Sequence, residues 1–477
     1  MMTFSPEKLA KWSEGQWHNS SLLNVPLTGF CIDTRKIEDG DVFIAISTER
    51  RDGHEFLNSA CQNGAVAAVV ERFIPDVAIP QLVVNNSVDA FLAIAHGHRM
   101  EFPGIVIGIT GSCGKTSTKD TLALLLGENL TCKTHANLNN QLGLSLTLLK
   151  LDPSIHKYAV VEVGISEAGE MGQLANTLVP DIAILTVVGS AHTEGIGGLE
   201  HVATEKAKLL RAVRNEGIAL FPSECLQYEA FRKPLDNPLI LYEIKDEKFS
   251  KNMLAFYWEF VPNAPDKGQL TVRNELIGKQ RFDLPDAAVG QGTVRNIAMS
   301  LGISLSVGVE PEVLQKRILK WAPSPMRGEL RSFGEQTFYV DCYNANPVSM
   351  NEAIQTFTTR FQEQPKLFVL GSMNELGDVA LEQHIKIGKT LQLAPEDRAV
   401  LIGHHAEAYR QGMIEAGIED SIITIASDLD EALPIVQAFQ GAILLKGSRS
   451  YGLERILEKA AADIDEKNEE RRLATAC

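Results

Sequence analysis

A glycine-rich loop between a predicted strand and a predicted helix constrains the fold of this chain more than any other feature. An apolar, mostly β-branched run at 105–109 leads into TGSCGKTSTKD, and the apolar-periodic TLALLLG follows. Gly111 and Gly114 allow a sharp turn, and backbone N–H groups at the start of the helix attract an anion. Lys115 is suited to neutralise terminal phosphates, and the hydroxyl of Thr116 is suited to reach Mg²⁺.

The loop departs from the usual phosphate-binding pattern, which has a glycine five residues before Gly114. Ile109 stands at that position, and Gly108 is one place too early. Because a Gly-Lys-Thr tripeptide is common by chance, the alternative is a glycine-rich turn with a solvated lysine. The strand before the loop and the helix after it favour a binding site for a nucleoside triphosphate.

Composition excludes several classes of protein. A chain of 477 residues exceeds one hydrophobic core, so about two to four domains are expected. Its hydrophobic content of 44% and charged content of 22% are those of a soluble globular protein. A net charge of −16 without a basic block argues against nucleic acid as a partner. The charged run DEKNEERR near the C-terminus is interpreted as a solvated helix end or tail.

The N-terminus and the cysteines bear on the compartment. The first residues, MMTFSPEKLAKWSEG, lack the apolar core of a signal peptide. No stretch approaches the ~20 apolar residues of a membrane span. The seven cysteines occur singly, which fits a reducing environment better than a disulfide framework or a zinc site. We therefore expect a cytoplasmic protein without a membrane span.

Changes of pattern along the chain predict an α/β protein with three units. Residues 1–103 alternate strand-like and helix-like segments, and RMEFPG marks their end. Residues 104–322 hold the loop and the strands YAVVEVG and DIAILTVV, which are apolar throughout as in a parallel sheet. An antiparallel excursion is expected between 221 and 290. Residues 323–477 follow the proline-bearing WAPSPMRG and repeat βα units, which predicts a separate parallel-sheet domain.

Two polar residues follow predicted strands at the edge where ligands bind in open parallel sheets. Glu162 ends the apolar run YAVVEVG, and His192 comes four residues after DIAILTVV. The Glu162 carboxylate would then reach a Mg²⁺ ion held by Thr116. Alternatively, Glu162 is capped by backbone N–H groups, and His192 is an ordinary loop histidine.

Lys206 lies on the apolar face of a predicted helix. Val202 and Leu209 mark that face at helical spacing, and Lys206 falls between them. A lysine on a buried stripe either extends outward or has a partner, so its position suggests a functional role.

Cys113 lies inside the phosphate loop, beside Lys115 and the helix N-terminus. Both neighbours stabilise a thiolate, so a depressed pKa and a reactive thiol are expected. The alternative is a buried and inert small side chain.

Motifs along nearly the whole chain resemble one family. These motifs are DTRKIEDGDVFIAI and RRDGHEFLNSACQNGA, the loop TGSCGKTSTKD, then NLNNQLGLSLTLL, VEVGISEAGEM and AHTEGIGGLEHVATEKAKLL, and finally DCYNANPVSM, NELG and LLKGSRS. Together they resemble the Mur ligases, the ATP-dependent amide ligases of peptidoglycan precursor synthesis. The resemblance implies a small α/β N-terminal domain that binds a UDP-linked substrate (1–103), a central P-loop ATPase domain with a mostly parallel sheet (104–322), and a Rossmann-like C-terminal ligase domain (323–477).

The resemblance also implies ligands and site residues. It implies catalytic roles for Lys115, His192, Lys206 and Arg327. The implied nucleotide-binding residues are Gly111, Ser112, Cys113, Gly114, Lys115, Thr116, Ser117, Asn296, Arg327 and Asp341. Two Mg²⁺ ions are implied, with Thr116, Glu162, His192 and a carbamylated Lys206 as the metal site. The implied substrate-binding residues are Thr34, Arg35, Asn137, Asn140, Asn344, Asn346 and Ser349.

Within the family, the chain looks most like members that join D-alanyl-D-alanine to a UDP-N-acetylmuramoyl-tripeptide, and a monomer is expected. It departs from the family motifs at Val187, Gly292, Val340 and Ser372. Two alternatives stay open. One is a related ligase with another amino-acid acceptor, although the Asp-Asn-Pro-Arg motif of the diamino-acid-adding type is absent. The other is a P-loop protein that binds or senses ATP without making a bond.

Overall fold

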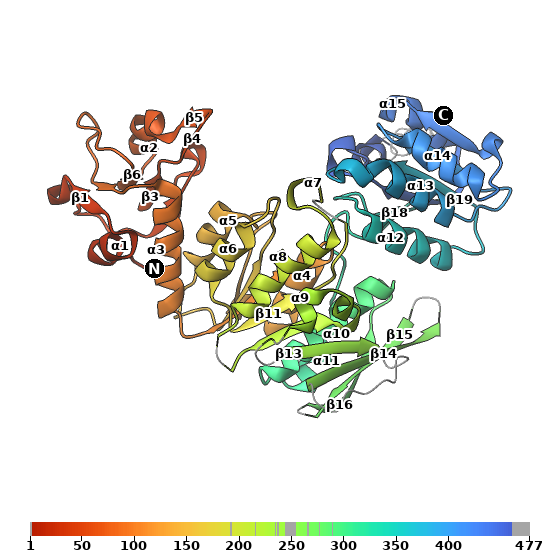
Figure 1. Ribbon diagram of the computed structural model, residues 1–477, viewed down its shortest axis with the longest axis horizontal. Coiled ribbons are helices and arrows are strands. Elements are labelled where there is room, and N and C mark those ends of the chain that lie inside the picture. The colour runs from red at the N-terminus through yellow and green to blue at the C-terminus, as the bar shows by residue number, and fades with distance from the viewer. Residues whose placement is uncertain are drawn as a thin grey trace, which may run out of the picture.

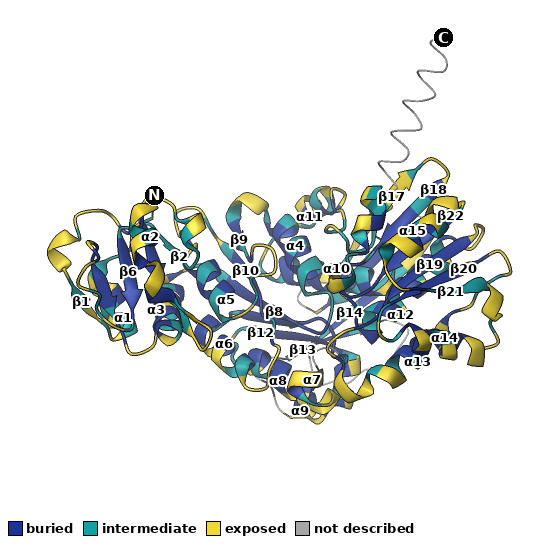
Figure 2. Ribbon diagram, turned by 90° about the horizontal axis from the view of Figure 1, so that it is seen from above, coloured by how far each residue is buried: buried dark blue, intermediate teal, exposed yellow. Residues whose placement is uncertain are grey.

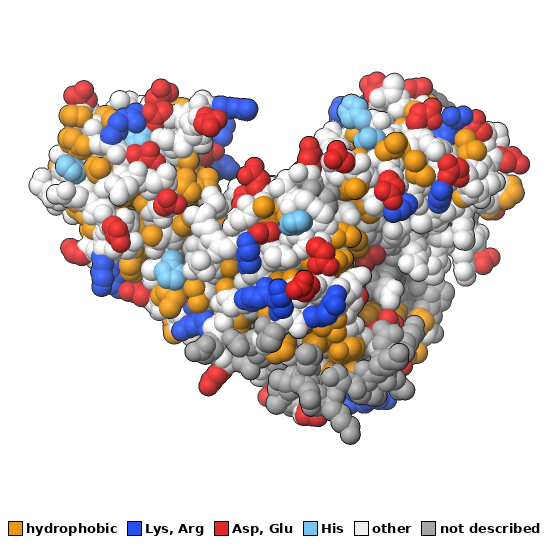
Figure 3. All heavy atoms as spheres, in the orientation of Figure 1, with side chains coloured by type: hydrophobic (Ala, Val, Ile, Leu, Met, Phe, Trp, Pro, Cys, Tyr) orange, Lys and Arg blue, Asp and Glu red, His pale blue; other side chains and the backbone are white. Residues whose placement is uncertain are grey.

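The computed structural model describes residues 2–459 except 191–192, 215, 234, 236–237, 244–253, 265–266, 276 and 289. Three lobes follow one another along the chain, and the first and last rise from opposite ends of the middle one (Figure 1). The face shown in Figure 3 is hollowed between these two outer lobes. Each lobe has its own mostly parallel sheet, as the sequence predicted for an α/β protein.

The first lobe is built on a five-stranded sheet with the order β1-β7-β6-β3-β2, in which only β1 is antiparallel to its neighbour. Its elements are α1 (Pro6–Ser13), β1 (Gln16–His18), η1 (Ser20–Leu22), β2 (Gly29–Cys31), η2 (Thr34–Lys36), β3 (Asp41–Ile44), β4 (Ser47–Thr48), β5 (Arg51–Asp52), η3 (Gly53–Phe56), α2 (Leu57–Gln62), β6 (Ala67–Val70), β7 (Gln81–Val83) and α3 (Ser87–Glu101). Helix α3 begins where the Asn86 side chain accepts a hydrogen bond from the Asp89 backbone N–H at 2.9 Å.

The middle lobe holds a nine-stranded sheet with the order β16-β15-β14-β13-β12-β11-β8-β10-β9. Its elements are β8 (Ile105–Thr110), α4 (Lys115–Leu126), η4 (Glu128–Leu130), β9 (Thr131–Lys133), α5 (Gln141–Leu148), β10 (Tyr158–Glu162), α6 (Glu170–Leu178), β11 (Ile182–Leu185), α7 (Thr193–Ile196), α8 (Leu199–Arg211), β12 (Ile218–Pro222), η5 (Ser223–Gln227), α9 (Glu229–Arg232), β13 (Pro238–Glu243), β14 (Leu254–Ala264), β15 (Lys267–Asn274), β16 (Gly278–Leu284), α10 (Gln291–Ser306) and α11 (Pro311–Ile318). The strands from β9 to β14 are parallel, so the predicted antiparallel excursion is limited to the β14–β15–β16 pairings.

The last lobe holds a six-stranded sheet with the order β17-β18-β22-β19-β20-β21. Its elements are β17 (Glu329–Phe333), β18 (Gln336–Val340), α12 (Pro347–Arg360), β19 (Lys366–Gly371), η6 (Gly377–Val379), α13 (Ala380–Thr390), β20 (Arg398–Ile402), α14 (Ala406–Glu415), η7 (Asp420–Ile422), β21 (Ile423–Ala426), α15 (Leu429–Ala438), β22 (Gly441–Lys446) and η8 (Arg449–Tyr451). Only the edge strand β17 is antiparallel. The charged run DEKNEERR lies outside the described residues.

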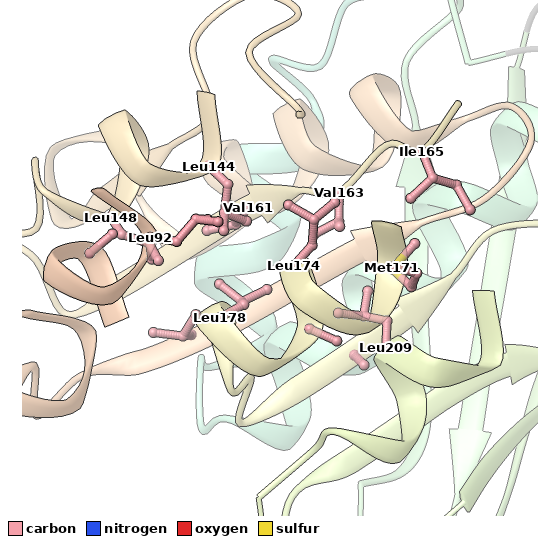
Figure 4. Packing of buried hydrophobic residues seen from close by; sticks show 14 of the residues in the cluster. Leu92, Leu144, Leu148, Val161, Val163, Ile165, Met171, Leu174, Leu178 and Leu209 are labelled. Atoms are coloured by element: carbon pink, nitrogen blue, oxygen red, sulfur yellow. The ribbon is translucent and has the colours of Figure 1, made fainter. Parts of the chain in front are cut away.

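The first lobe is joined to the middle one by a shared hydrophobic core. Leu92 of α3 belongs to the same buried cluster as Leu144 and Leu148 of α5 (Figure 4). In Figure 2 the strands of the central sheet are buried, while exposed residues gather on the outer helices and loops. Because this cluster runs without interruption from the first sheet to the central one, α3 is held against the middle lobe by apolar burial.

A buried arginine reinforces the same junction. Arg99, at the end of α3, is 0% exposed, and its guanidinium donates to the backbone carbonyls of Leu178 and Val179 at 3.0 and 2.9 Å. The same group pairs with the Asp181 carboxylate at 2.8 Å. Asp181 in turn accepts the Val106 backbone N–H at 2.8 Å, at the start of β8. The junction therefore lies directly behind the strand that carries the phosphate loop.

Candidate active site

One cavity of about 330 Å³ lies between the middle and last lobes. It is lined by most of the residues that the sequence singled out: Ser112 to Ser117, Asn137, Asn140, Glu162, Asn296, Arg327, Asp341, Asn344, Asn346 and Ser349. Most of the candidate residues named from the sequence therefore lie around one cavity. Gly111, Thr34, Arg35 and Lys206 are not part of the lining, and His192 lies outside the described residues.

The loop after β8 takes a conformation that only glycine accommodates at two points. Gly111 has φ +149° and Gly114 has φ +81°. A Cβ atom on Gly111 would lie 1.9 Å from the Thr186 hydroxyl oxygen, and one on Gly114 would lie 2.7 Å from Nδ2 of Asn296. The loop is thus held close to both neighbours, and its backbone N–H groups open helix α4, where an anion is favoured.

Lys115 extends back across this loop. Its ammonium group donates a hydrogen bond to the Gly111 carbonyl oxygen at 2.8 Å. Burial lowers the pKa of Lys115, and the Glu162 carboxylate opposes that shift. A lysine at the turn that opens α4, together with the backbone N–H groups at the start of that helix, suits the terminal phosphates of a nucleotide.

Glu162 is held in place by three hydrogen bonds. The hydroxyl of Thr116 donates to Oε2 at 2.9 Å, and the side-chain amide of Asn139 donates to Oε1 at 3.0 Å. The hydroxyl of Thr134 accepts the Glu162 backbone N–H at 2.9 Å. Glu162 is 3% exposed and ends β10 beside β8. Its carboxylate is therefore bonded to side chains, and the alternative in which backbone N–H groups cap it does not apply.

Lys206 is buried on the inner face of α8, as its spacing predicted. It is 2% exposed, and Val202 and Leu209 beside it are fully buried. Among the described residues its ammonium group has no ion pair. Burial, together with the positive charge of Lys115, lowers the pKa of Lys206 to about 7. A lysine with such a pKa is about half uncharged at pH 7, and its uncharged amine is nucleophilic.

The last lobe contributes an ion pair and a stacked arginine. The Asp341 carboxylate pairs with the Lys446 ammonium group at 3.1 Å. Lys446 is 1% exposed and also donates to the Asn344 carbonyl oxygen at 2.8 Å. The Arg327 guanidinium lies 4.1 Å from the centre of the Tyr343 ring. These contacts fix an acidic and a basic group opposite the phosphate loop.

Two of the predicted substrate-binding residues form a helix cap. The Asn346 side chain accepts the Ser349 backbone N–H at 2.9 Å, and the Ser349 hydroxyl accepts the Asn346 backbone N–H at 3.1 Å. This box starts α12. The amide of Asn346 also donates to the Ser112 carbonyl oxygen at 3.0 Å, so the cap directly joins the last lobe to the phosphate loop.

The remaining predicted residues lie at the edges of the site. Asn137 and Asn140 are exposed, and Asn140 caps α5 by accepting the Gly143 backbone N–H at 3.0 Å. Thr34 and Arg35 lie on η2 in the first lobe, away from the cavity lining. Arg35 forms two hydrogen bonds of 2.8 Å with the Asp33 carboxylate and is otherwise exposed.

The expectation of a depressed pKa at Cys113 is wrong. Burial in the cavity wall raises the pKa of the Cys113 thiol to about 12, and the negative charge of Glu352 acts in the same direction. The positive charge of Lys115 lowers the pKa only in part. Desolvation thus outweighs the neighbouring charges that the sequence made visible.

Sequence reasoning missed several residues that shape the site. Asn139, Tyr343, Lys446 and Glu352 all line or support it. The sequence pattern could have identified Lys446, because this residue ends an apolar strand at the ligand-binding edge of the sheet, as Glu162 does. Asn139 could not be told from its neighbours in NLNN.

No helix among the described residues is long and apolar enough to cross a membrane.

A phosphate loop on a parallel sheet, facing charged residues of a second α/β lobe across one cavity, defines a nucleotide-dependent enzyme. Comparison with known families agrees with this class. Residues 26–92 match the profile described as "Mur ligase family, catalytic domain", residues 109–303 match "Mur ligase middle domain", and residues 326–449 match "Mur ligase, glutamate ligase domain".

Individual relatives align over almost the whole chain. A UDP-N-acetylmuramoyl-tripeptide–D-alanyl-D-alanine ligase of Buchnera aphidicola subsp. Baizongia pistaciae is 30% identical, over 92% of this chain and 94% of its own. The protein of that name from Bacillus subtilis is 28% identical, over 96% and 98%. A crystal structure of MurF from Acinetobacter baumannii superposes with a TM-score of 0.83 at 27% identity, over 97% and 99% of the two chains. The MurF ligase of Thermotoga maritima in complex with ADP gives 0.78 at 26%, over 92% and 99%.

The chain belongs to the Mur ligase family. The three-domain α/β fold expected from the sequence is confirmed by these structures.

Proposed function

We propose that this protein joins D-alanyl-D-alanine to a UDP-N-acetylmuramoyl-tripeptide, with conversion of ATP to ADP and phosphate, in peptidoglycan precursor synthesis. Relatives of that name cover almost the full chain, and one similar structure was solved with ADP. The observation that carries the proposal is the single cavity in which the phosphate loop and Glu162 face Arg327 and Asp341 of another lobe. A ligase needs such an arrangement because a phosphoryl group must pass between two bound substrates.

The reaction has two steps. A carboxylate of the tripeptide attacks the γ-phosphorus of ATP, so that an acyl phosphate forms and ADP leaves. The amine of D-alanyl-D-alanine then attacks the acyl carbon, loses a proton, and expels phosphate as the amide bond forms. Lys115 and the loop N–H groups would hold the transferred phosphate, and Arg327 would neutralise the charge that develops on it. Asp341 would bind the ribose, and Asn296 the adenine.

The donor set at Glu162 fits Mg²⁺. The Thr116 hydroxyl and the Glu162 carboxylate are hard oxygen ligands, and they already lie within 2.9 Å of each other. When bound, Mg²⁺ supplies positive charge to the phosphate oxygens. We propose two such ions, with His192 and Lys206 serving the second. An unmodified ammonium group does not fit a cation site, whereas a carbamate on the Lys206 amine is anionic and presents oxygen atoms.

The outer lobes would bind the two substrates to be joined. We propose the domain limits 1–103, 104–322 and 323–477, with Thr34 and Arg35 of the first domain near the uridine. Asn137, Asn140, Asn344, Asn346 and Ser349 would face the peptide and the dipeptide. The hollow between the outer lobes leaves room for an extended substrate between these positions (Figure 3). Because water destroys an acyl phosphate, closing of the last lobe on the loop would protect it. We propose that the protein acts as a monomer in the cytoplasm.

The test is product formation by the purified full-length chain. ADP release is measured with UDP-N-acetylmuramoyl-tripeptide and each of several amine acceptors, and the product is identified by mass spectrometry. The proposal expects rapid ADP release and one new amide only with D-alanyl-D-alanine. A preference for a single amino acid would instead indicate another Mur-type acceptor. A rate of ADP release that is the same with every acceptor and without one would indicate an ATPase. Lys115→Ala is the control, because it removes the phosphate-binding lysine and should abolish turnover.

A further inference from the structure

The lining of the cavity includes a carboxylate to which the proposed reaction gives no role. Glu352, on α12 of the last lobe, lies directly over Gly292, near the start of α10 in the middle lobe. A Cβ atom on Gly292 would be 2.4 Å from Oε2 of Glu352 and 2.5 Å from Oε1. The absence of a side chain at Gly292 therefore creates the space that the Glu352 carboxylate occupies.

The Glu352 carboxylate lies near a positive charge but receives no hydrogen bond from the residues that the structure describes. Its Oε1 lies 3.6 Å from the Arg295 guanidinium, which is beyond hydrogen-bond distance. Arg295 makes its close contact elsewhere, at 2.6 Å to the Glu224 carboxylate. Among the described residues Glu352 accepts no hydrogen bond; its side chain is 37% exposed, and the residue lines the cavity. Arg295 thus lies near the Glu352 carboxylate as a positive charge and leaves its hydrogen-bond acceptor capacity open.

A second unsatisfied acceptor lies one helical turn away. Asn296 follows Gly292 by four residues, so the two share a face of α10 at a separation of about 5–6 Å. Asn296 is 8% exposed, and its Oδ1 atom has no hydrogen-bond partner among the described residues. Both Asn296 and Glu352 line the cavity, and they come from different lobes. Two acceptors with open capacity therefore belong to the lining of the cavity that also holds the phosphate loop.

We infer that Glu352, together with Asn296, selects a purine with a 6-amino group. That amino group has two N–H bonds, and one acceptor from each lobe can take one of them. A 6-oxo purine presents an acceptor oxygen at the same place, which a carboxylate repels in a partly desolvated site. The middle lobe, through Asn296, and the last lobe, through Glu352, would thereby bind the same amino group of the base. This inference rests on the proposed function, because it requires a nucleotide in this cavity.

Equilibrium binding of ADP and IDP to the full-length protein tests the inference, because these nucleotides differ at the 6-position. Isothermal titration calorimetry should show that the wild type prefers ADP by about tenfold or more. Glu352→Gln should reduce this ratio by about tenfold, since the amide can also donate to a 6-oxo group. Gly292→Ala should do the same with the carboxylate intact, because the added methyl group displaces it. The exposed Glu363→Gln, just beyond α12, is the matched control and should leave the ratio unchanged.

Melting temperatures establish that each variant is folded, and Gly292→Ala is a mild change because this glycine is helical. The inference is overturned if the wild type binds ADP and IDP equally, or if both variants weaken the two nucleotides in the same proportion. The second result would make Glu352 a closing contact between lobes. Failure of the proposed function has a different signature, in which nucleotides bind selectively but no amide product forms.

Discussion

The side-chain amide of Asn346 donates a hydrogen bond to the backbone carbonyl of Ser112 at 3.0 Å, and its side-chain oxygen starts helix α12. One residue thus both builds a helix of the last lobe and holds that lobe to the phosphate loop. The position of the last lobe relative to the loop therefore depends on a donor that is separable from the cap.

Asn346→Asp separates these two roles. The aspartate keeps the oxygen that caps α12, but it replaces the donor facing Ser112 with an oxygen that repels the carbonyl. Loss of this hydrogen bond should cost about 1–2 kcal/mol of binding free energy and so lower kcat/KM for ATP by about 5- to 30-fold. The melting temperature should stay near that of the wild type. Asn346→Ala should lose both activity and stability. Unchanged kinetics in the aspartate variant would show that the contact does not contribute to turnover.

Glu162→Gln should raise the Mg²⁺ concentration needed for half-maximal activity by about tenfold, because it removes an anionic oxygen ligand. Excess Mg²⁺ should restore the rate only in part. Asn139→Ala keeps the carboxylate but removes its 3.0 Å hydrogen bond, and a smaller shift in the same direction is expected. Mn²⁺ binding followed by electron paramagnetic resonance provides a readout independent of turnover. His192→Ala should behave like Glu162→Gln. Wild-type metal dependence in all three variants would assign these residues a structural role.

The Cys113 thiol should react slowly with iodoacetamide at pH 7–8, because a pKa of about 12 leaves almost no thiolate there. The labelling rate should rise about tenfold for each pH unit up to the limit of protein stability. Peptide mass spectrometry measures the rate, with the partly exposed Cys61 as an internal reference. Bound ADP should slow labelling of Cys113 only. A rate that reaches a plateau below pH 8 would restore the original expectation of a reactive thiol.

The sequence was sufficient to locate a site residue where the spacing of apolar residues indicates which positions are buried. Strand ends and helix faces are such patterns, and they located Glu162 at the ligand edge and Lys206 on the inner face of α8. Contacts between distant segments leave no local pattern. The pKa of Cys113 depends on burial and on the charge of Glu352 from the last lobe, and the stacking of Arg327 on Tyr343 depends on how one loop folds back. The edge strand β17 was missed because its residues are partly exposed and carry no apolar run.

His384 should make the last lobe sensitive to acid. The neutral ring uses both nitrogens: Nδ1 donates to the Ala380 carbonyl at 2.6 Å, and Nε2 accepts the Met373 backbone N–H at 2.8 Å. Burial lowers the pKa of His384 to about 4, below that of the unfolded chain. Between about pH 6.5 and 4 the unfolded chain therefore binds a proton that the folded chain does not, so up to about 3 kcal/mol of stability is lost as the pH falls.

Calorimetric unfolding at pH 7 and pH 4.5 measures this effect against the general acid sensitivity of the protein. His384→Gln keeps a donor and an acceptor but does not titrate, so its melting temperature should fall less between the two pH values than that of the wild type. The exposed neighbour His404→Gln should behave as the wild type does. Equal losses in His384→Gln and the wild type would contradict the prediction.

Lys206 permits a prediction about the proposed carbamate. A cationic lysine would repel Mg²⁺, whereas the buried amine, with a pKa of about 7, can react with CO₂ and lose a proton to become anionic. Lys206→Ala should therefore be folded and nearly inactive, and short carboxylic acids should restore part of its activity by occupying the vacated space with an oxygen anion. Lys206→Arg should not be rescued, because the guanidinium keeps the charge and fills the gap. Lys208→Ala, on the more exposed side of α8, is the matched control and should stay active.

Two measurements separate the carbamate from a purely structural lysine. Depleting CO₂ from the buffer should slow the wild type and leave the acid-rescued Lys206→Ala unaffected, because the added acid replaces the carbamate. Carbon-13 NMR of protein equilibrated with labelled bicarbonate should show a carbamate resonance that is absent from Lys206→Ala. Full activity of Lys206→Ala without added acid would show that Lys206 serves only to pack α8 against the sheet, and the second metal site would then need other ligands.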